Sequence, residues 1–287
     1  MDRRTFLLAT GAAALTPRFA AGAAAAGSGV FERTEPAGAT DEPQRVFFHR
    51  PASWRPDGRV VFVMHGLGRN ADGYRDAWAP LADRYGFLLV CPEFSDRKFP
   101  KADWHTYGGW RVMSDPARRA FAVPDRVFAE LRSRFGATAS KFSLYGHSAG
   151  AQFTHRYLLL APSSNVDQVV AANAGWYTMP VFDQPFPYGL ADTGLTKDDV
   201  RRFLTRPLVL QLGEADTDPN HESLRRSALA DKQGLHRYAR GLNYMAVAKR
   251  EADALGVKLA WRVVTVPGAD HDNNKMAASA AAVLFSS

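Results

Sequence analysis

Apolar residues along the chain form short runs that alternate with longer amphipathic stretches. Runs bounded by Gly, Pro or Asp predict buried β-strands, and the stretches between them predict helices. Strands that alternate with helices indicate crossover connections around a mostly parallel central sheet with helices on both faces. The expected strands cover 45–49, 59–64, 87–91, 141–145, 168–172, 207–212 and 259–266, with the first two as neighbours, and the expected helices cover 74–85, 117–135, 149–160, 243–255 and 274–285.

Three stretches interrupt this alternation. Residues 27–43 are mostly Gly, Ala, Thr, Glu and Pro without periodicity, which predicts a linker before a catalytic domain at 44–287. Residues 176–206 are rich in Pro, Phe, Tyr and Asp, and residues 217–240 are polar and basic. We expect both to form loops or short helices over the mouth of the sheet, as insertions that cover the active site.

Residues 1–26 have the three regions of an export signal. Arg3 and Arg4 precede a short Ala-rich apolar run, and small residues suited to cleavage follow before Gly27. The arginine pair resembles a twin-arginine signal, and the apolar run is too short to span a bilayer. We therefore expect a bacterial protein exported to the periplasm or beyond, without stable membrane insertion after the signal is cleaved.

Composition fits one large globular domain after this signal. The 287 residues are 46% hydrophobic and 23% charged, and the net charge is +7. Cleavage after residue 26 removes three arginines and one aspartate, which leaves +5. Basic residues are interspersed with acids rather than gathered in a stripe, so we expect no nucleic-acid partner. The single cysteine, Cys91, ends an apolar run and is expected to be a buried structural thiol.

Residues 146–150 read Gly-His-Ser-Ala-Gly and match the pattern G-x-S-x-G. The apolar run before them ends at Tyr145, and helix-forming residues resume at Ala149. This is the strand-turn-helix context in which the motif exposes a serine nucleophile. Side chains in place of the two glycines would clash with the neighbouring strand and helix. We therefore expect Ser148 to be a nucleophile; the alternative is a Gly-rich turn without chemistry.

A serine hydroxyl needs a general base to act as a nucleophile. In the fold that carries this motif, the base follows the last strand and an acid follows the strand before it. His271 follows the last expected strand, and Glu214, Asp216 and Asp218 follow the preceding one. Asp216 has the usual spacing of a few residues past the strand end. The expected triad is therefore Ser148, Asp216 and His271.

The tetrahedral intermediate of such a reaction needs backbone N–H donors for its oxyanion. One donor is expected from Ala149, the residue after the nucleophile, and the other from Leu67 or Gly68 in the loop after the strand at 59–64. Aromatic residues near strand ends could line the substrate cleft, and Trp110, Trp176 and Tyr177 are the candidates.

No motif for a metal or cofactor stands out. His271 could form a metal site with Asp270 and Asp272, but no further ligand cluster accompanies them. The glycines near Leu67 lack the Lys-Ser/Thr pair of a phosphate-binding loop. We therefore expect neither a metal nor a cofactor.

With these elements assigned, residues 44–287 resemble the α/β-hydrolase superfamily. Within it, the chain is similar to secreted esterases grouped with polyhydroxybutyrate depolymerases and feruloyl esterases. The similarity lies in the loop at 65–70, the strand end at 91–94 and the segment Val-Pro-Gly-x-x-His at 266–271. Two departures, the basic stretch at 233–241 and the lack of an appended polymer-binding module, argue against a polymeric substrate.

The resemblance implies a serine hydrolase that cleaves carboxylic esters through an acyl-enzyme. The expected substrate is a small-molecule or short oligomeric ester, with an aromatic or short hydroxyacyl group favoured. A peptidase or a thioesterase uses the same triad and stays open as an alternative. A non-catalytic binding protein of the same fold is the other alternative, because fold alone does not imply activity.

Overall fold

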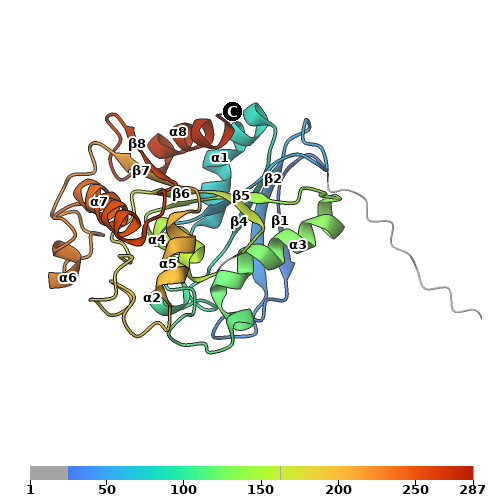
Figure 1. The fold of residues 1–287 in the computed structure, drawn as a ribbon. Helices are drawn as coiled ribbons and strands as arrows, with labels where there is room; N and C mark the ends of the chain where they lie inside the picture. Colours follow the sequence, from blue (N-terminus) through green and yellow to red (C-terminus); the bar gives the residue numbers. More distant parts are fainter. Residues whose placement is uncertain (1–24, 162, 287) are drawn as a thin grey trace, which may run out of the picture.

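A computed structural model describes residues 25–161 and 163–286 (Figure 1). These residues form one eight-stranded sheet with the strand order β1-β2-β4-β3-β5-β6-β7-β8. From β4 to β8 neighbouring strands are parallel, and β1 and β2 add an antiparallel edge. The strands are β1 Gly27–Arg33, β2 Gln44–Arg50, β3 Val60–Met64, β4 Leu88–Pro92, β5 Phe142–His147, β6 Val166–Ala172, β7 Leu208–Gly213 and β8 Trp261–Val266.

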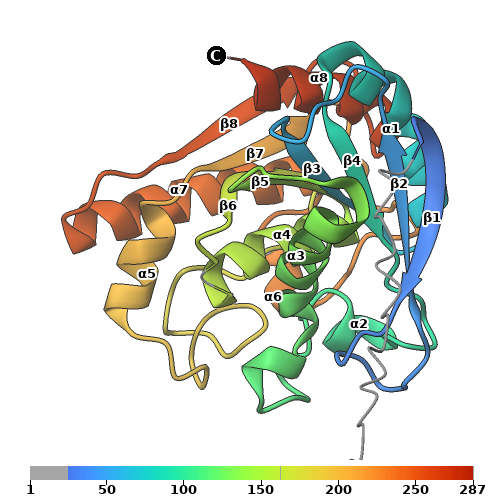
Figure 2. The same ribbon diagram turned by 90° about the vertical axis from the view of Figure 1, so that its right-hand side faces the viewer.

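Helices cover both faces of the sheet, which confirms the expected α/β class (Figure 2). Helices α1 and α8 pack on one face, and α3, α4, α5 and α7 pack on the other. The helices are α1 Ala71–Tyr85, α2 Lys101–Trp104, α3 Val123–Phe135, α4 Ala149–Leu160, α5 Lys197–Leu204, α6 Ala228–Asp231, α7 Arg237–Leu255 and α8 Asn273–Phe285, with 3₁₀ turns at Pro116–Arg118 and Ala120–Ala122.

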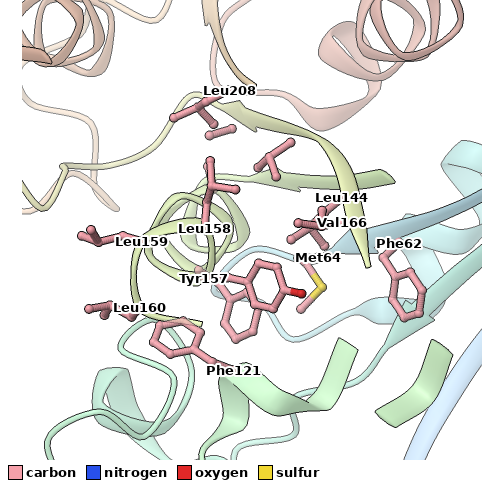
Figure 3. Close-up of a cluster of buried hydrophobic side chains, with 14 of the residues drawn as sticks. Phe62, Met64, Phe121, Leu144, Tyr157, Leu158, Leu159, Leu160, Val166 and Leu208 are labelled. Atoms are coloured by element: carbon pink, nitrogen blue, oxygen red, sulfur yellow. The ribbon is translucent and has the colours of Figure 1, made fainter. Parts of the chain in front are cut away.

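The pleat of the sheet divides the apolar core into two layers. In β3, Phe62 and Met64 point toward α4, whereas Val61 and Val63 point toward α1 and α8. Figure 3 shows Phe62 and Met64 among the buried side chains of the layer on the α4 side of the sheet. Strands buried on both faces read as continuous apolar runs, and this is why the sequence predicts them well.

The expected linker at 27–43 is wrong, because its first part is strand β1. All seven residues of β1 pair antiparallel with β2. Arg33, buried at the end of β1, donates to Glu130 of α3 at 2.6 Å and to Glu35. Arg126 of α3 also donates to Glu35. A segment with this ladder and a buried ion network belongs to the domain.

Two further expectations need correction. The strands near 45–49 and 59–64 are not neighbours, because β4 lies between β2 and β3 and pairs with both. After β3 the chain crosses through α1 and forms β4 on the side of β3 that faces β2. The helix expected at 117–135 begins only at Val123, after two 3₁₀ turns.

The expected signal at 1–26 lies outside the described residues apart from its last two positions. Among the helices that are described, none combines the length and apolar character needed to cross a membrane.

Candidate active site

Ser148 lies at a strained turn between β5 and α4. Its backbone has φ 57° and ψ −114°, a conformation that residues with a side chain rarely adopt. A Cβ on Gly146 would lie 2.3 Å from the carbonyl oxygen of Gly150. A Cβ on Gly150 would lie 2.1 Å from the carbonyl oxygen of Met64. Both motif glycines are therefore required by backbone packing, and the turn projects the serine away from the sheet.

His271 bridges Ser148 and Asp216. Its Nδ1 lies 2.8 Å from Asp216 Oδ2, and its Nε2 lies 2.9 Å from Ser148 Oγ. Because a carboxylate only accepts, Nδ1 donates to Asp216, and in the neutral ring Nε2 is left to accept from the serine hydroxyl. Burial lowers the pKa of His271 below 6.5 although the bond to Asp216 opposes this, and Arg237 lowers it further. The neutral ring is therefore the ground state near pH 7.

The other acids near these residues are engaged elsewhere. Glu214 and Asp218 are exposed, and Asp218 accepts from the Asn220 N–H at 2.8 Å. Asp270 pairs with Lys275 at 2.8 Å, and Asp272 caps α8. Among the described residues no group of three His, Cys, Asp or Glu side chains could hold a metal ion.

Arg237, the first residue of α7, completes the surroundings of Asp216. Its Nη1 lies 3.3 Å from Asp216 Oδ1, and its Nη2 donates to Ser223 Oγ at 2.9 Å. Both members of the ion pair are buried, with side chains 1% and 2% exposed. This role of Arg237 is not predicted from the sequence, although the residue lies in the basic stretch that departs from related esterases. An arginine at this position orients the carboxylate and balances its charge.

The loop after β3 lies directly beside Ser148. A Cβ on Gly66 would lie 3.7 Å from Ser148 Cβ. His65 holds this loop, because its Nδ1 donates to the Gly66 carbonyl at 2.9 Å and its Nε2 accepts from the Phe94 N–H at 2.9 Å. Burial lowers the pKa of His65 to about 4, so the ring stays neutral and keeps this bonding pattern.

The expected oxyanion donors lie around this loop. Ala149 begins α4, and the first N–H groups of a helix have no partner within it. In the described part of the chain, the N–H groups of Leu67 and Gly68 donate to no protein acceptor. These N–H groups belong to the residue that follows Ser148 and to two residues that line the cavities beside it.

A cavity of about 300 Å³ opens beside Ser148. Trp176 lines it, as expected, and Tyr107 and Arg225 line it as well. The lid candidates at 176–206 and 217–240 thus each contribute residues to its wall. A second cavity of about 580 Å³ includes His271, Asn273 and the 66–68 loop, and it shares Ser148, Leu67 and Ser223 with the first. Ser148 therefore lies between two spaces that can receive the two halves of a substrate.

The expectation that Tyr177 and Trp110 line the cleft is wrong. Tyr177 is fully buried and stacks on Tyr244 with ring centroids 4.3 Å apart. Trp110 lies outside both cavities, against the Arg119 guanidinium at 4.1 Å. Trp176 and Tyr177 follow β6 in a bend rather than in a strand, and of the two only Trp176 faces the cavity.

The solved structures that match this chain include two that are at least 35% identical to it. Poly(aspartic acid) hydrolase-1 from Sphingomonas sp. KT-1 is 38% identical with a TM-score of 0.86, covering 91% of this chain and 99% of that one. LpqC, a poly(3-hydroxybutyrate) depolymerase from Bordetella parapertussis, is 35% identical with a TM-score of 0.85, covering 91% and 90%. An S-formylglutathione hydrolase from Agrobacterium tumefaciens shares the fold, at 16% identity and a TM-score of 0.59 over 90% and 92%. No protein-family model and no curated protein matches the sequence.

Proposed function

We propose that this chain, which belongs to the α/β-hydrolase superfamily, hydrolyses carboxylic esters through an acyl-enzyme. Within the superfamily it groups with its two relatives at 35% and 38% identity, among the serine esterases. The observation that carries this proposal is the bridge from Asp216 through His271 to Ser148. Nucleophile, base and orienting acid in one hydrogen-bonded line are the arrangement that covalent acyl transfer requires.

The proposed reaction has two halves. Ser148 Oγ attacks the ester carbonyl while its proton passes to His271 Nε2, and the tetrahedral intermediate collapses as His271 returns this proton to the departing alcohol. Water then loses a proton to His271, attacks the acyl carbonyl, and frees Ser148 and the acid. Asp216 stabilises the imidazolium that forms in each half without taking the proton itself.

The oxyanion of each tetrahedral intermediate is proposed to bind the N–H groups of Ala149 and of Leu67 or Gly68. Fixed backbone donors need no reorganisation as charge develops, and the loss of one donor in a comparable enzyme costs about 10² to 10³ in kcat. The neutral His65 that braces the loop supports this role, because it keeps the Gly66 peptide from turning.

The substrate is proposed to be a small or short oligomeric ester. The names of the two relatives specify a poly(aspartic acid) and a poly(3-hydroxybutyrate) as substrates of those proteins. In this chain, a cavity of about 300 Å³ walled by Trp176 and Tyr107 suits a short acyl or alcohol group.

Fluorophosphonate labelling followed by a substrate panel tests the proposed function. We expect stoichiometric labelling of Ser148, located by peptide mass spectrometry, and turnover of p-nitrophenyl esters. A labelled protein that cleaves peptides or thioesters faster than esters would favour those alternatives. A correctly folded protein that neither labels nor turns over would indicate a binding protein.

The pH dependence should report the ionisation of His271. The ring must be neutral to accept the serine proton, so kcat/KM should fall as the pH drops through its pKa, which lies below 6.5. Arg237 lowers this pKa by charge repulsion, so Arg237→Gln should raise it and move the acidic limb to higher pH. The measurement is a kcat/KM profile of both proteins between about pH 4 and pH 9, a range that brackets the ordinary histidine pKa.

Arg240→Gln is the matched control for this profile. Arg240 is equally buried on the same helix, but it bonds Gly175 and Asp231 instead of Asp216. The Arg240→Gln variant should be less stable than the wild type, but the acidic limb of its kcat/KM profile should stay at the same pH. If the acidic limb of Arg237→Gln lay at the same pH as that of the wild type, the role given to Arg237 would be contradicted.

Export through the twin-arginine route is a separate proposal, supported by the sequence of residues 1–26. Changing Arg3 and Arg4 together to Lys should keep the protein in the cytoplasm of a producing bacterium while lysates keep esterase activity. Fractionation with an activity assay measures this. Continued export of the double variant would point to the general secretory route.

A further inference from the structure

The cavity that Ser148 shares with Trp176 has an excess of positive charge. Arg69, Lys101 and Arg225 line it, whereas Asp96 is the one acidic residue among the described residues that line it. Asp96 pairs with Arg69 at 3.0 Å, so the charge of Arg69 is already balanced. In the described part of the chain no carboxylate pairs with Lys101 or Arg225. Two cations therefore face the cavity without an acidic partner.

A hydrogen bond from Nε holds the Arg225 guanidinium in one orientation. Its Nε donates to Tyr188 Oη at 2.8 Å, and this hydroxyl also lies 2.9 Å from Ser227 Oγ. The guanidinium lies 5.9 Å from the ring centroid of Trp176, another wall residue of the cavity. No acceptor among the described residues contacts its two terminal nitrogens, so these are available to a ligand. A guanidinium presented in this way matches the planar geometry of a carboxylate.

Arg156, a third cation without an acidic partner among the described residues, lies beneath the cavity. It is fully buried, and it donates to the carbonyl oxygens of Thr106 and Gln152, both residues of the cavity wall, at 3.1 and 3.2 Å. Burial lowers its pKa to about 10, which leaves it charged at pH 7. Its Nη2 has no partner, and no carboxylate pairs with it, among the residues that the structure describes.

The environment of Arg156 extends its field into the cavity. Its guanidinium lies 4.4 Å from the ring centroid of Trp176 and 5.2 Å from that of Tyr107. These rings stabilise the cation but carry no net charge, so they do not cancel its field. A buried cation without a counter-ion raises the positive potential of a low-dielectric wall, and such a cavity concentrates anionic ligands.

We propose that this cavity binds a free carboxylate carried by the ester substrate, with Arg225 as the residue that contacts it. This rests on the proposed function, ester hydrolysis at Ser148, and narrows it to esters with an acidic group. The limited volume favours a short acid, either the half-ester of a dicarboxylic acid or the free-acid end of a short hydroxyacid oligomer.

The test compares each acidic ester with its own methyl ester. Mono-p-nitrophenyl adipate carries the carboxylate on the acyl side of the scissile bond, and the linear dimer of 3-hydroxybutyrate carries it on the alcohol side. We expect wild-type kcat/KM to favour the acid over the methyl ester by about 10- to 100-fold in at least one pair, the range of a charge-assisted hydrogen bond. Raising the salt concentration should reduce this preference.

Arg225→Gln should reduce the preference to within about threefold of unity, because it removes the charge but keeps a polar side chain. Arg225→Lys should retain part of it. Arg226→Gln is the matched control: Arg226 is the adjacent exposed arginine, lies outside the cavity and pairs with Asp231, so the preference should stay at the wild-type value.

Two results would overturn the carboxylate proposal while ester hydrolysis stands. One is equal kcat/KM for acid and methyl ester in both pairs in the wild type, and the other is a preference that survives in Arg225→Gln. If instead none of the four esters is hydrolysed above the Ser148→Ala background, ester hydrolysis itself fails and the carboxylate proposal fails with it.

Discussion

Replacing Ser148 by Ala should lower kcat for ester substrates by about 10⁴-fold or more, as losses of a triad nucleophile do. The change removes the atom that forms the acyl-enzyme, so neither His271 nor the backbone donors can compensate. The residual rate should equal that of water attack on a bound ester, assisted only by those donors. Steady-state kinetics with a p-nitrophenyl ester, over the uncatalysed background, measures the loss.

The fold should survive this substitution. Ser148 already holds φ 57°, and alanine carries the same Cβ, so the strain of the turn is unchanged. The variant loses only the hydroxyl bonded to His271. Thermal unfolding should therefore show a melting temperature close to that of the wild type. Near-normal turnover by Ser148→Ala would rule out Ser148 as the nucleophile.

Ser148, Asp216 and His271 could be selected from sequence because each depends on a short local pattern. The turn at Ser148 depends on two glycines that backbone contacts require, and these contacts arise wherever such a strand enters such a helix. The two partners follow apolar runs that form strands β7 and β8, and parallel strands bring their carboxyl ends to one edge of the sheet. Local pattern and sheet topology together therefore bring these side chains close.

Strand β1 could not be predicted in the same way. Its first four residues, Gly-Ser-Gly-Val, carry small side chains apart from Val30, which is typical of a linker, and the strand is held by pairing with β2 and by contacts to α3. The partner of Arg33 on α3, Glu130, is 97 residues away in sequence. Such a pairing has no signature within a local window.

Arg237 and Tyr177 illustrate a second limit, which is the direction of a side chain. An arginine in a polar and basic stretch predicts a solvated surface, yet Arg237 is buried because its partner Asp216 is buried. Trp176 and Tyr177 are adjacent aromatic residues with similar propensities, and only the path of the chain after β6 decides that the first faces the cavity. Composition carries no information on either point.

Replacing Asp216 by Asn should lower kcat by up to about 10⁴-fold while keeping the shape of the site. The carboxylate accepts from Nδ1 of His271, which leaves Nε2 free to accept the serine proton. An amide whose N–H₂ faces the ring would favour the tautomer with the proton on Nε2, which cannot act as the base. The amide also cannot stabilise the imidazolium by charge. Steady-state kinetics between about pH 6 and pH 9, a range from just below to well above the ordinary histidine pKa, should show the loss throughout.

Asp218→Asn separates this effect from a general change of charge in the same loop. Asp218 follows the same strand two positions later, but it is exposed and accepts only from the Asn220 N–H. Its amide variant removes one negative charge from the same loop without changing any bond to the His271 ring, so kcat should fall by less than about threefold, in keeping with the small effect of exposed charges. If Asp218→Asn lost most of its kcat and Asp216→Asn lost little, the acid of the triad would be Asp218. The loop would then have to rearrange before the imidazolium forms, since Asp216 is the carboxylate that His271 contacts at 2.8 Å.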